Sequence, residues 1–386
     1  MIHYDRVWAE IDLDAISYNI EQIKSKIKKE TQIICVIKTD GYGHGALQIA
    51  KHLQHQDRIW GFAVATVEEA VTLRKNGINA KILILGYTFP YCYSELVDME
   101  IRPTVFMLET ARQLSEAAVK ENKNCKIHIK IDTGMTRIGI MPDEEGLRLV
   151  EEISKLPNLE IEGIFTHFAT ADEQSTSKAY HQFEVFRDFV SLLEDRLGYQ
   201  IPLKHCSNSA GISEMPEANM DAVRAGIILH GLWPSNEVKE KKNIDLKPAL
   251  SLKTKVVYVK TVPKNCEVSY GGTFVTFRDT RIATVCIGYG DGYPRSLSNV
   301  GTVLVNGQRA YIIGRVCMDQ MMIDITDIRG NVCVGDTVTL IGKDQDEEIT
   351  MEELGELSGR FNYELACDLG KRIPRIYKAD DTLICE

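Results

Sequence analysis

The chain has 386 residues, of which 44% are hydrophobic and 26% charged, a balance typical of folded globular proteins and not of disordered or fibrous ones. This length exceeds what one hydrophobic core usually supports, so we expect two domains, one of them large enough to be a barrel. The 45 basic and 55 acidic residues give a net charge of −10 with both signs interspersed, which argues against a nucleic-acid partner.

The chain shows no pattern for export or membrane insertion. Its first residues, Met-Ile-His-Tyr-Asp-Arg-Val-Trp, contain no basic segment followed by an apolar run, and no later stretch is apolar enough to span a bilayer. The ten cysteines occur singly, and Cys35, Cys286, Cys317 and Cys333 lie in apolar runs, so we expect reduced, buried thiols. No group of side chains completes a metal site. These features predict a cytoplasmic protein without a metal ion.

The first part of the chain alternates short apolar runs with amphipathic helical patterns, which is typical of repeated βα units. Thr66 with Glu69 forms a capping-box pattern, and Gly198 stands where a helix should end. No G-x-G-x-x-G motif follows an early strand, and roughly eight or nine strands over some 220 residues favour a (β/α)8 TIM-type barrel. The predicted strands are 8–11, 33–37, 60–64, 82–85, 102–105, 127–131, 161–165 and 203–206, with 223–229 as a further candidate.

After about residue 236 the helical periodicity disappears, and strand patterns follow one another directly. Asn306-Gly307 between two such runs is a strong signal for a two-residue type I′ hairpin. One clear helix is expected, beginning at Thr350 with Glu353 three residues on. We therefore expect a barrel domain over 1–236 and a mostly β domain over 237–386. The predicted strands of this second domain are 252–262, 282–287, 302–305, 311–313, 321–325 and 337–341.

Lys38 occupies an unusual position, directly after a buried strand and before the glycine-rich turn Thr-Asp-Gly-Tyr-Gly-His-Gly. A lysine in apolar surroundings loses hydration, which lowers its pKa and makes the neutral amine a nucleophile able to form a Schiff base. The simpler interpretation is a surface lysine that marks the end of a strand. Position alone favours this simpler interpretation. Whether Lys38 is catalytic therefore depends on which residues follow the other predicted strands.

Polar side chains also follow other predicted strands, and such positions form the catalytic rim of a (β/α)8 barrel. Arg137 and His167 bring a guanidinium and an imidazole to this rim. Ser209 opens a helix after a later strand, and Gly226 offers backbone donors without bulk, so both suit an anion. Each element alone fits a structural role. Together they predict a rim with an amine, cations and a phosphate site.

The segment Val-Ile-Lys38-Thr-Asp-Gly-Tyr42-Gly-His-Gly resembles the pyridoxal-phosphate attachment site of alanine racemases. The resemblance extends along the whole chain in the family's order and spacing, and this combination is highly specific. Two departures, Gly290 where the family usually has alanine and the looser stretch 367–375, put only substrate preference in doubt. The other matching segments are Ile-Asp132-Thr-Gly-Met-Thr-Arg137-Ile-Gly, Thr-His167-Phe-Ala-Thr-Ala-Asp172, Ser-Asn208-Ser209-Ala, Val-Arg224-Ala-Gly226-Ile, Ser-Tyr270-Gly, Ile-Gly-Tyr289-Gly-Asp291-Gly, Gly-Arg315-Val-Cys-Met318-Asp319-Gln and Asn-Tyr363-Glu.

The resemblance implies a role for each matching residue. Lys38 would hold the pyridoxal 5'-phosphate, and Arg224 would face its pyridine nitrogen. Arg137 would contact the cofactor phenolate and the substrate carboxylate, and it stays open whether Lys130 is carbamylated so as to orient Arg137. The other implied cofactor-binding residues, most of them around the phosphate, are Tyr42, Asn208, Ser209, Gly226, Ile227 and Tyr363.

Racemisation needs a base on one face of the α-carbon and an acid on the other, and the resemblance assigns these roles to Lys38 and Tyr270. His167 would assist Tyr270 through a hydrogen bond. Arg224 stays protonated, so the pyridine nitrogen would remain largely neutral, which weakens the cofactor as an electron sink. The implied substrate-binding residues are Arg137, Tyr289, Met318 and Asp319.

The implied function is the interconversion of L-alanine and D-alanine, which would supply D-alanine for cell-wall peptidoglycan. In the family the tyrosine reaches the lysine of a second subunit, so the resemblance also implies a head-to-tail homodimer with shared active sites. A racemase for serine or for a broader set of amino acids is the main alternative. A decarboxylase of the same fold ranks lower, because that class places a carboxylate where Arg224 stands. Non-catalytic barrel proteins that bind the cofactor lack a β domain with an opposing tyrosine.

Overall fold

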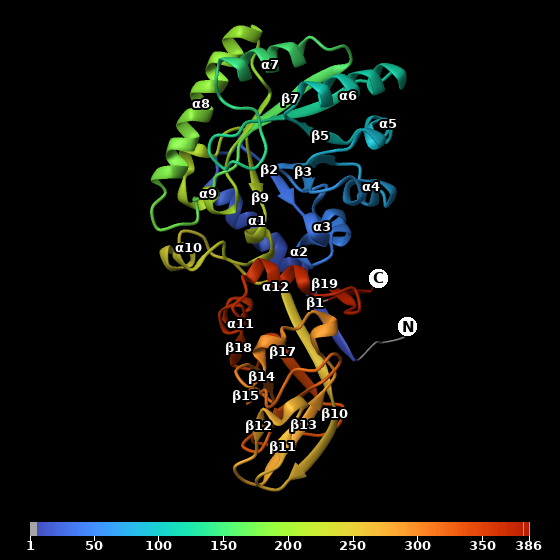
Figure 1. The fold of residues 1–386 in the computed structure, drawn as a ribbon, viewed down its shortest axis with the longest axis vertical. Helices are drawn as coiled ribbons and strands as arrows, with labels where there is room; N and C mark the ends of the chain where they lie inside the picture. Colours follow the sequence, from blue (N-terminus) through green and yellow to red (C-terminus); the bar gives the residue numbers. More distant parts are fainter. Residues whose placement is uncertain (1–5, 381, 386) are drawn as a thin grey trace. The chain divides into compact units, whose positions relative to one another are not determined.

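The computed structural model describes residues 6–380 and 382–385 and divides into two compact units (Figure 1). We call them the barrel unit, Ser17–Gly41 with Ala46–Leu246, and the β unit, Met1–Ile16 with Tyr42–Gly45 and Lys247–Glu386. Residues 1–5, where the sequence shows no leader pattern, lie outside the described residues. Among the residues described, no helix has both the length and the apolar character that a membrane span requires.

The barrel unit contains eight strands in one parallel sheet, ordered β8-β7-β6-β5-β4-β3-β2-β9. Its two edge strands are linked by hydrogen bonds from the Asp221 N–H to the Lys204 carbonyl (3.1 Å) and from the Arg224 N–H to the Ser207 carbonyl (3.0 Å). The barrel is therefore nearly closed, which confirms the predicted (β/α)8 fold. The strands are β2 (Gln32–Val36), β3 (Ile59–Val64), β4 (Lys81–Ile84), β5 (Arg102–Val105), β6 (Cys125–Lys130), β7 (Leu159–Phe165), β8 (Leu203–His205) and β9 (Ala222–Ala225).

Helices lie outside these strands (Figure 1), and the longer ones, such as Leu108–Lys120 and Glu144–Ser154, bury an apolar stripe that recurs every three or four residues. The Glu69 N–H donates to the Thr66 hydroxyl, which confirms the predicted capping box, and Gly198 ends its helix with a φ of 73°. The helices are α3 (Ala46–Leu53), α4 (Val67–Lys75), α5 (Tyr93–Asp98), α6 (Leu108–Lys120), α7 (Glu144–Ser154), α8 (Ser177–Leu197), α9 (Ser209–Glu214) and α10 (Asn236–Lys241), while α1 (Leu13–Lys26) and α2 (Lys38–Tyr42) each cross from one unit to the other along the chain.

The strand predicted at 8–11 forms as β1 (Val7–Asp12), but its assignment to the barrel is wrong. β1 pairs antiparallel with β10 (Leu250–Val262) and parallel with β19 (Arg375–Ala379), both in the β unit. Its side chains alternate between buried and partly exposed positions, as expected for a sheet with one solvated face and not for a barrel strand covered on both faces. The domain boundary at residue 236 stays a prediction.

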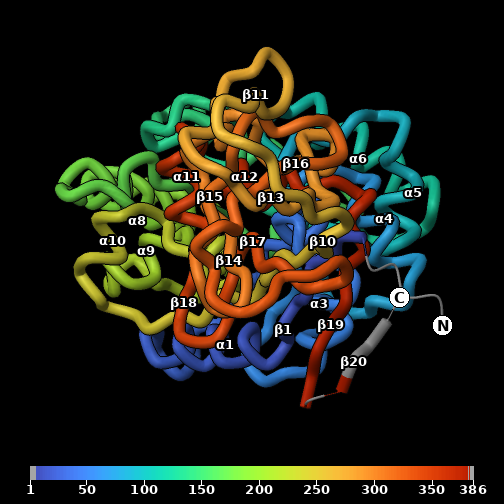
Figure 2. The backbone as a smooth tube through the Cα atoms, turned by 90° about the horizontal axis from the view of Figure 1, so that it is seen from below, coloured from blue at the N-terminus to red at the C-terminus, as the bar shows by residue number. Residues whose placement is uncertain are grey.

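The β unit is built on a ten-stranded sheet whose main path is β15-β14-β17-β10-β1-β19-β20. Figure 2 shows β14, β15 and β17 side by side. The predicted hairpin is confirmed, because Val305 pairs with Gln308 across Asn306 and Gly307, which have φ values of 52° and 69°. The remaining strands are β11 (Glu267–Val268), β12 (Phe274–Val275), β13 (Thr280–Val285), β14 (Thr302–Val305), β15 (Gln308–Tyr311), β16 (Met321–Asp324), β17 (Thr337–Asp344), β18 (Glu347–Ile349) and β20 (Thr382–Cys385).

Three expectations for the β unit need correction. The strand expected at 311–313 lies at 308–311, because the two-residue turn fixes its register. A second helix, α12 (Asn362–Asp368), follows the predicted one, α11 (Met351–Ser358). Cys333 is exposed in the loop before β17, while Cys286 and Cys317 are partly buried and Cys35 is buried as expected.

Replacing Thr66 by alanine should destabilise the barrel unit by about 1 kcal/mol, because α4 then loses the hydroxyl that accepts from its first turn. The change is measured as a shift in the denaturant midpoint of unfolding. Thr66→Ser keeps an acceptor and serves as the control. An equal loss in both variants would show that the methyl group, and not the cap, stabilises the helix.

Candidate active site

Lys38 opens a left-handed turn at the end of β2. The three residues 39–41 have φ values of 53°, 51° and 63°, and Tyr42 continues the turn with a φ of 52°. This conformation costs a residue other than glycine about 1–2 kcal/mol. The Asp40 carboxylate accepts a hydrogen bond from the Ala46 N–H (2.9 Å) and holds the turn. Strain of this kind gathers at functional sites, so the geometry supports the selection of Lys38.

Four cations act on His167 within the barrel unit. Burial, followed by the charges of Arg224, Arg137, Lys130 and Lys38, lowers the pKa of His167 well below its usual value. The pKa of Lys130 falls to about 7 because its ammonium group is buried and lies near Arg224 and Arg137. His167 is therefore neutral near pH 7 and lies in a positive field that suits an anionic ligand.

Arg224 is the central cation of this group, and its guanidinium is buried. Burial lowers its pKa to about 10, so it remains charged near neutral pH. Its Nε–H makes no hydrogen bond within the described residues, so this donor is available to a ligand. The two terminal nitrogens donate to the His205 carbonyl (2.9 Å) and Nδ1 (2.9 Å), the Thr166 carbonyl (2.7 Å), the Cys206 carbonyl (2.8 Å) and His167 Nδ1 (3.2 Å).

Arg137 follows a turn that is organised by Asp132. The Gly134 and Thr136 N–H groups each donate to Asp132 Oδ1 at 3.0 Å, and the Thr133 and Thr166 hydroxyls are 2.7 Å apart. These contacts fix the path of the chain up to Arg137, whose side chain is exposed. The backbone at Arg137 is therefore fixed by the turn, while its guanidinium is accessible to a ligand from solution.

The segments predicted to bind the phosphate meet in the barrel unit. The Gly226 N–H donates to the Ser209 hydroxyl (3.1 Å), which joins the start of α9 to the turn before the 3-10 helix η3 (Ile227–His230). The first N–H groups of a helix have no intrahelical acceptor, so these donors fit an anion. Asn208 acts as the cap of α9: its side-chain oxygen accepts from the Gly211 N–H (3.0 Å). This capping role was missed, although Asn-Ser before a helix is a known signal.

Tyr42 and Tyr363, the two tyrosines predicted to bind the phosphate, come together in the β unit. Their rings meet edge to face with centroids 6.0 Å apart. Gly45 has a φ of 91°, and a Cβ atom there would lie 1.7 Å from the Tyr377 hydroxyl oxygen. The glycine at this point of the turn is therefore required by close packing.

Tyr270 opens a short 3-10 helix in the β unit, and its side chain is 71% exposed. The preceding residue, Ser269, has a φ of 66° and donates its hydroxyl to the Arg315 carbonyl (2.7 Å). The backbone at Tyr270 is thus anchored while its phenol stays accessible, as expected of a residue that acts on a molecule outside its own packing.

Tyr289, Met318 and Asp319 lie on two adjacent segments of the β unit. The Tyr289 N–H donates to the Cys317 carbonyl (3.0 Å), and the Gly290 N–H donates to the Met318 carbonyl (2.9 Å). The Tyr289, Met318 and Asp319 side chains are exposed. The structure therefore brings three of the four predicted substrate-binding residues together.

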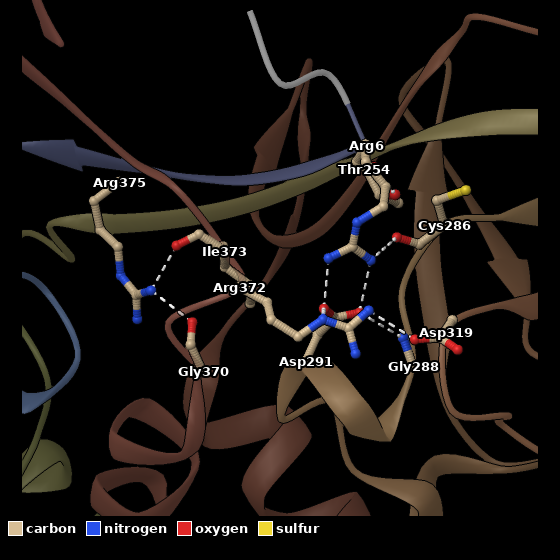
Figure 3. Close-up of polar contacts among 10 residues, drawn as sticks. All are labelled: Arg6, Thr254, Cys286, Gly288, Asp291, Asp319, Gly370, Arg372, Ile373 and Arg375. Atoms are coloured by element: carbon tan, nitrogen blue, oxygen red, sulfur yellow. Dashed lines mark hydrogen bonds and ion pairs between the residues drawn. The ribbon is translucent and has the colours of Figure 1, made fainter. Parts of the chain in front are cut away.

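A buried carboxylate that the sequence analysis did not single out holds these segments (Figure 3). Asp291 is fully buried and accepts two hydrogen bonds from Arg6, at 2.6 and 2.9 Å. Arg372 lies 3.5 Å from Asp291 and 2.7 Å from Asp319, so one guanidinium links both carboxylates (Figure 3). An aspartate between two glycines in Gly-Tyr-Gly-Asp-Gly was the available signal, since a carboxylate there serves as a local acceptor.

The described residues contain no group of three histidine, cysteine, aspartate or glutamate side chains arranged to hold a metal ion. The predicted residues fall into one set per unit, and their roles stay predictions. The barrel unit holds Lys38, Arg137, His167, Asn208, Ser209, Arg224, Gly226 and Ile227, and the β unit holds Tyr42, Tyr270, Tyr289, Met318, Asp319 and Tyr363.

A (β/α)8 barrel with polar and basic residues at the carboxyl ends of its strands has the architecture of barrel enzymes, whose active sites lie at that face. The model of the alanine racemase N-terminal domain matches residues 11–234, and that of the alanine racemase C-terminal domain matches residues 249–377. The chain therefore belongs to the alanine racemase family, whose members are isomerases.

Individual relatives agree with this assignment. The chain is 48% identical to an alanine racemase of Clostridium perfringens over 379 residues, covering 98% of this chain and 97% of the relative. An alanine racemase structure from Clostridium difficile 630 superimposes with a TM-score of 0.94 at 40% identity, covering 99% and 98% of the two chains. The structure of a Bacillus anthracis alanine racemase with bound L-Ala-P gives a TM-score of 0.91 at 38% identity, covering 100% and 98%.

Replacing Asp291 by asparagine should destabilise the β unit by about 2 kcal/mol, because Arg6 loses its charged partner. The cost stays below that of a fully buried pair, since the Arg6 side chain is 35% exposed. Denaturant unfolding measures the change. Glu347→Gln, which removes an exposed partner of Arg309, is the control and should cost under about 0.5 kcal/mol. Equal costs would contradict the anchoring role of Asp291.

Proposed function

We propose that the chain interconverts L-alanine and D-alanine with pyridoxal 5'-phosphate as cofactor. The observation that carries the proposal is the convergence of Lys38, Lys130, Arg137 and Arg224 on neutral His167. These residues combine an amine for covalent attachment with cations for a phosphate and a carboxylate. Family membership adds the reaction, since relatives that match nearly the whole chain are named alanine racemases.

The residues present fit the proposed cofactor. Lys38 is the proposed attachment residue, and the N–H groups at Ser209 and Ile227 are proposed to bind the phosphate together with Tyr42 and Tyr363. The Nε–H of Arg224, which makes no hydrogen bond within the described residues, would donate a hydrogen bond to the pyridine nitrogen. When bound, pyridoxal phosphate supplies a covalent attachment for the substrate amine and withdraws electrons from its α-carbon.

Arg224 favours a racemase over a decarboxylase of the same fold. Its guanidinium stays charged and offers only N–H donors, so it would donate to an unprotonated pyridine nitrogen and disfavour protonation of that nitrogen. The resulting weak electron sink suits a reaction that must return the proton to carbon without side reactions. Incubation with L-alanine, followed by assays for D-alanine and for carbon dioxide, separates the two functions.

Lys38 and Tyr270 are the proposed bases on the two faces of the α-carbon. His167 accepts from Arg224 at Nδ1, so the proton of its neutral ring lies on Nε2 and is available for donation. A donor of this kind stabilises a phenolate, so it would assist an approaching tyrosine that exchanges a proton with the substrate. We propose that this tyrosine is Tyr270 of a second subunit in a head-to-tail homodimer.

Substrate recognition is proposed to involve both sets of residues. Arg137 binds the substrate carboxylate, and the exposed segments with Tyr289, Met318 and Asp319 limit the side chain. Whether Lys130 is carbamylated stays open, although the lowering of its pKa to about 7 leaves much of its amine neutral near pH 7. Serine stays the main alternative substrate. Supply of D-alanine to peptidoglycan and a cytoplasmic location complete the proposal.

Tyr270→Phe should keep the cofactor and lose one proton-transfer partner. In the family the tyrosine faces the hydrogen of the L-enantiomer. In deuterated water, loss of the α-hydrogen from L-alanine should therefore fall by about 10² to 10⁴-fold, while exchange from D-alanine through Lys38 falls much less. Proton NMR measures both rates, and the cofactor absorbance controls for binding. Equal slowing of both exchanges would mean that Tyr270 shapes the pocket and is not a base.

Two inactive variants, Lys38→Ala and Tyr270→Ala, should regain partial activity when they are mixed and allowed to exchange subunits. In a mixed dimer one of the two shared sites would then carry both intact residues. Size-exclusion chromatography with differently tagged subunits verifies the exchange. Absence of activity in verified mixed dimers would place both bases in a single chain.

A further inference from the structure

A chain of hydrogen bonds continues from Arg224 into the interior of the barrel. Arg224 Nη1 lies 2.9 Å from His205 Nδ1, and His205 Nε2 lies 3.0 Å from His128 Nδ1. His128 Nε2 lies 3.5 Å from Glu162 Oε2. Both imidazoles are completely buried, and the Glu162 side chain is 8% exposed. Two imidazoles that the proposed reaction does not use therefore connect the Glu162 carboxylate to the proposed cofactor-binding arginine.

The donors and acceptors in this chain run in one direction. A guanidinium only donates, so His205 Nδ1 accepts and its proton lies on Nε2. That N–H donates to His128 Nδ1, which places the His128 proton on Nε2, facing the Glu162 carboxylate. Burial lowers the pKa of His128 and His205, so both rings stay neutral near pH 7.

The far end of the chain is held by an ionic cluster. Burial opposes ionisation of Glu162, but hydrogen bonds from His128 and Arg102 lower its pKa to about 2. Arg102 donates to Glu162 at 3.1 Å, and Lys126 and Lys81 lie 3.6 and 3.9 Å from its other oxygen. Arg102 is the first residue of β5 and His167 follows the end of β7, so the cluster lies toward the end of the strands opposite the rim.

Aromatic rings fix the two imidazoles in this arrangement. His205 stacks on Phe165 with centroids 4.7 Å apart and an angle of 5°, and His128 meets Trp60 edge to face at 5.3 Å. Glu162 and Trp60 line a hollow of about 710 Å³. A buried polar network of this size costs more free energy than apolar residues that would fill the same core, so packing alone does not account for it.

We infer that Glu162, acting through His128 and His205, is a positioning residue. It orients Arg224 from the end of the barrel opposite the rim and stabilises its positive charge. The negative carboxylate polarises both imidazoles, which makes His128 Nδ1 a stronger acceptor for the His205 N–H and His205 Nδ1 a stronger acceptor for the Arg224 guanidinium. The terminal nitrogens are held in this way, and Nε–H remains directed to a ligand. The effect on catalysis rests on the proposed function, whereas the direction of the hydrogen bonds does not.

The direction of the hydrogen bonds between Arg224, His205 and His128 is tested by NMR spectroscopy. The full-length protein is labelled with ¹⁵N at histidine and measured both without and with pyridoxal phosphate. We expect His128 and His205 to be neutral, with the proton on Nε2, from about pH 7 upward. Spectra of single histidine variants assign the signals. A proton on Nδ1 of either ring, or a cationic ring in this range, would overturn the inference even if the protein proves to be an active racemase.

The positioning effect is tested with Glu162→Gln. Glutamine carries no charge, so it no longer polarises His128 and His205, whereas Arg224 still keeps the proton of both rings on Nε2. Glu162 acts on Arg224 as an outer partner acts on a metal ligand, by orienting it through a hydrogen bond. Loss of such a partner typically costs 10- to 100-fold in function, so we expect a loss of about 10-fold in kcat/KM. Glu160→Gln is the matched control. Glu160 lines the same hollow and pairs with Lys126 (3.3 Å), but it makes no hydrogen bond to His128 or His205. Equal effects of the two variants would refute the inference.

A second pair of variants applies if Glu162→Gln does not fold. His128→Gln keeps an oxygen that accepts from the His205 N–H, whereas His128→Phe removes the acceptor and fills similar space. We expect His128→Gln to retain most of the activity and His128→Phe to lose most of it, while Arg224 keeps the His205 proton on Nε2 in both variants. Equal activities in the two folded variants would show that the histidines only fill the core.

Discussion

Arg224 carries a charge that titration does not remove near neutral pH, and this charge lies inside the barrel unit. Such a group is tolerated in a protein interior only when acceptors surround it. Three carbonyl oxygens at the ends of β7 and β8, together with two imidazoles, meet this requirement. The segments that carry His167 and Ser209 are consequently fixed around one guanidinium, and much of the proposed site follows from satisfying that single cation.

The sequence predicts those parts of the fold whose signals are local. Most barrel strands contain short apolar runs, helix α4 begins with a capping box, and Asn306-Gly307 specifies a two-residue turn. The rim residues Lys38, Arg137 and His167 could be found because they follow apolar runs that end at one face of a barrel. Their assignment to a particular reaction depended on resemblance, since position alone also fits a structural role.

Long-range pairing was not predictable in the same way. β1 joins the β unit because it pairs with β10, about 240 residues further along the chain, and no local signal names that partner. Asp291 needs Arg6, which is 285 residues away in sequence. The buried network left a weak trace, since His128, Glu162 and His205 interrupt apolar strands, yet only coordinates show that their side chains meet.

The strained turn at 39–41 also escapes prediction, because its glycine is only one of several left-handed residues and propensity argues against the others. The turn persists because contacts hold the chain on both sides of it. In the barrel unit the Asp40 carboxylate accepts from the Ala46 N–H, and in the β unit Gly45 packs against Tyr377. Lys38 and Tyr42, which belong to different units, are separated only by this turn. The glycine-rich segment that suggested a cofactor is therefore also the segment where the chain passes between the units, and both demands explain its residues.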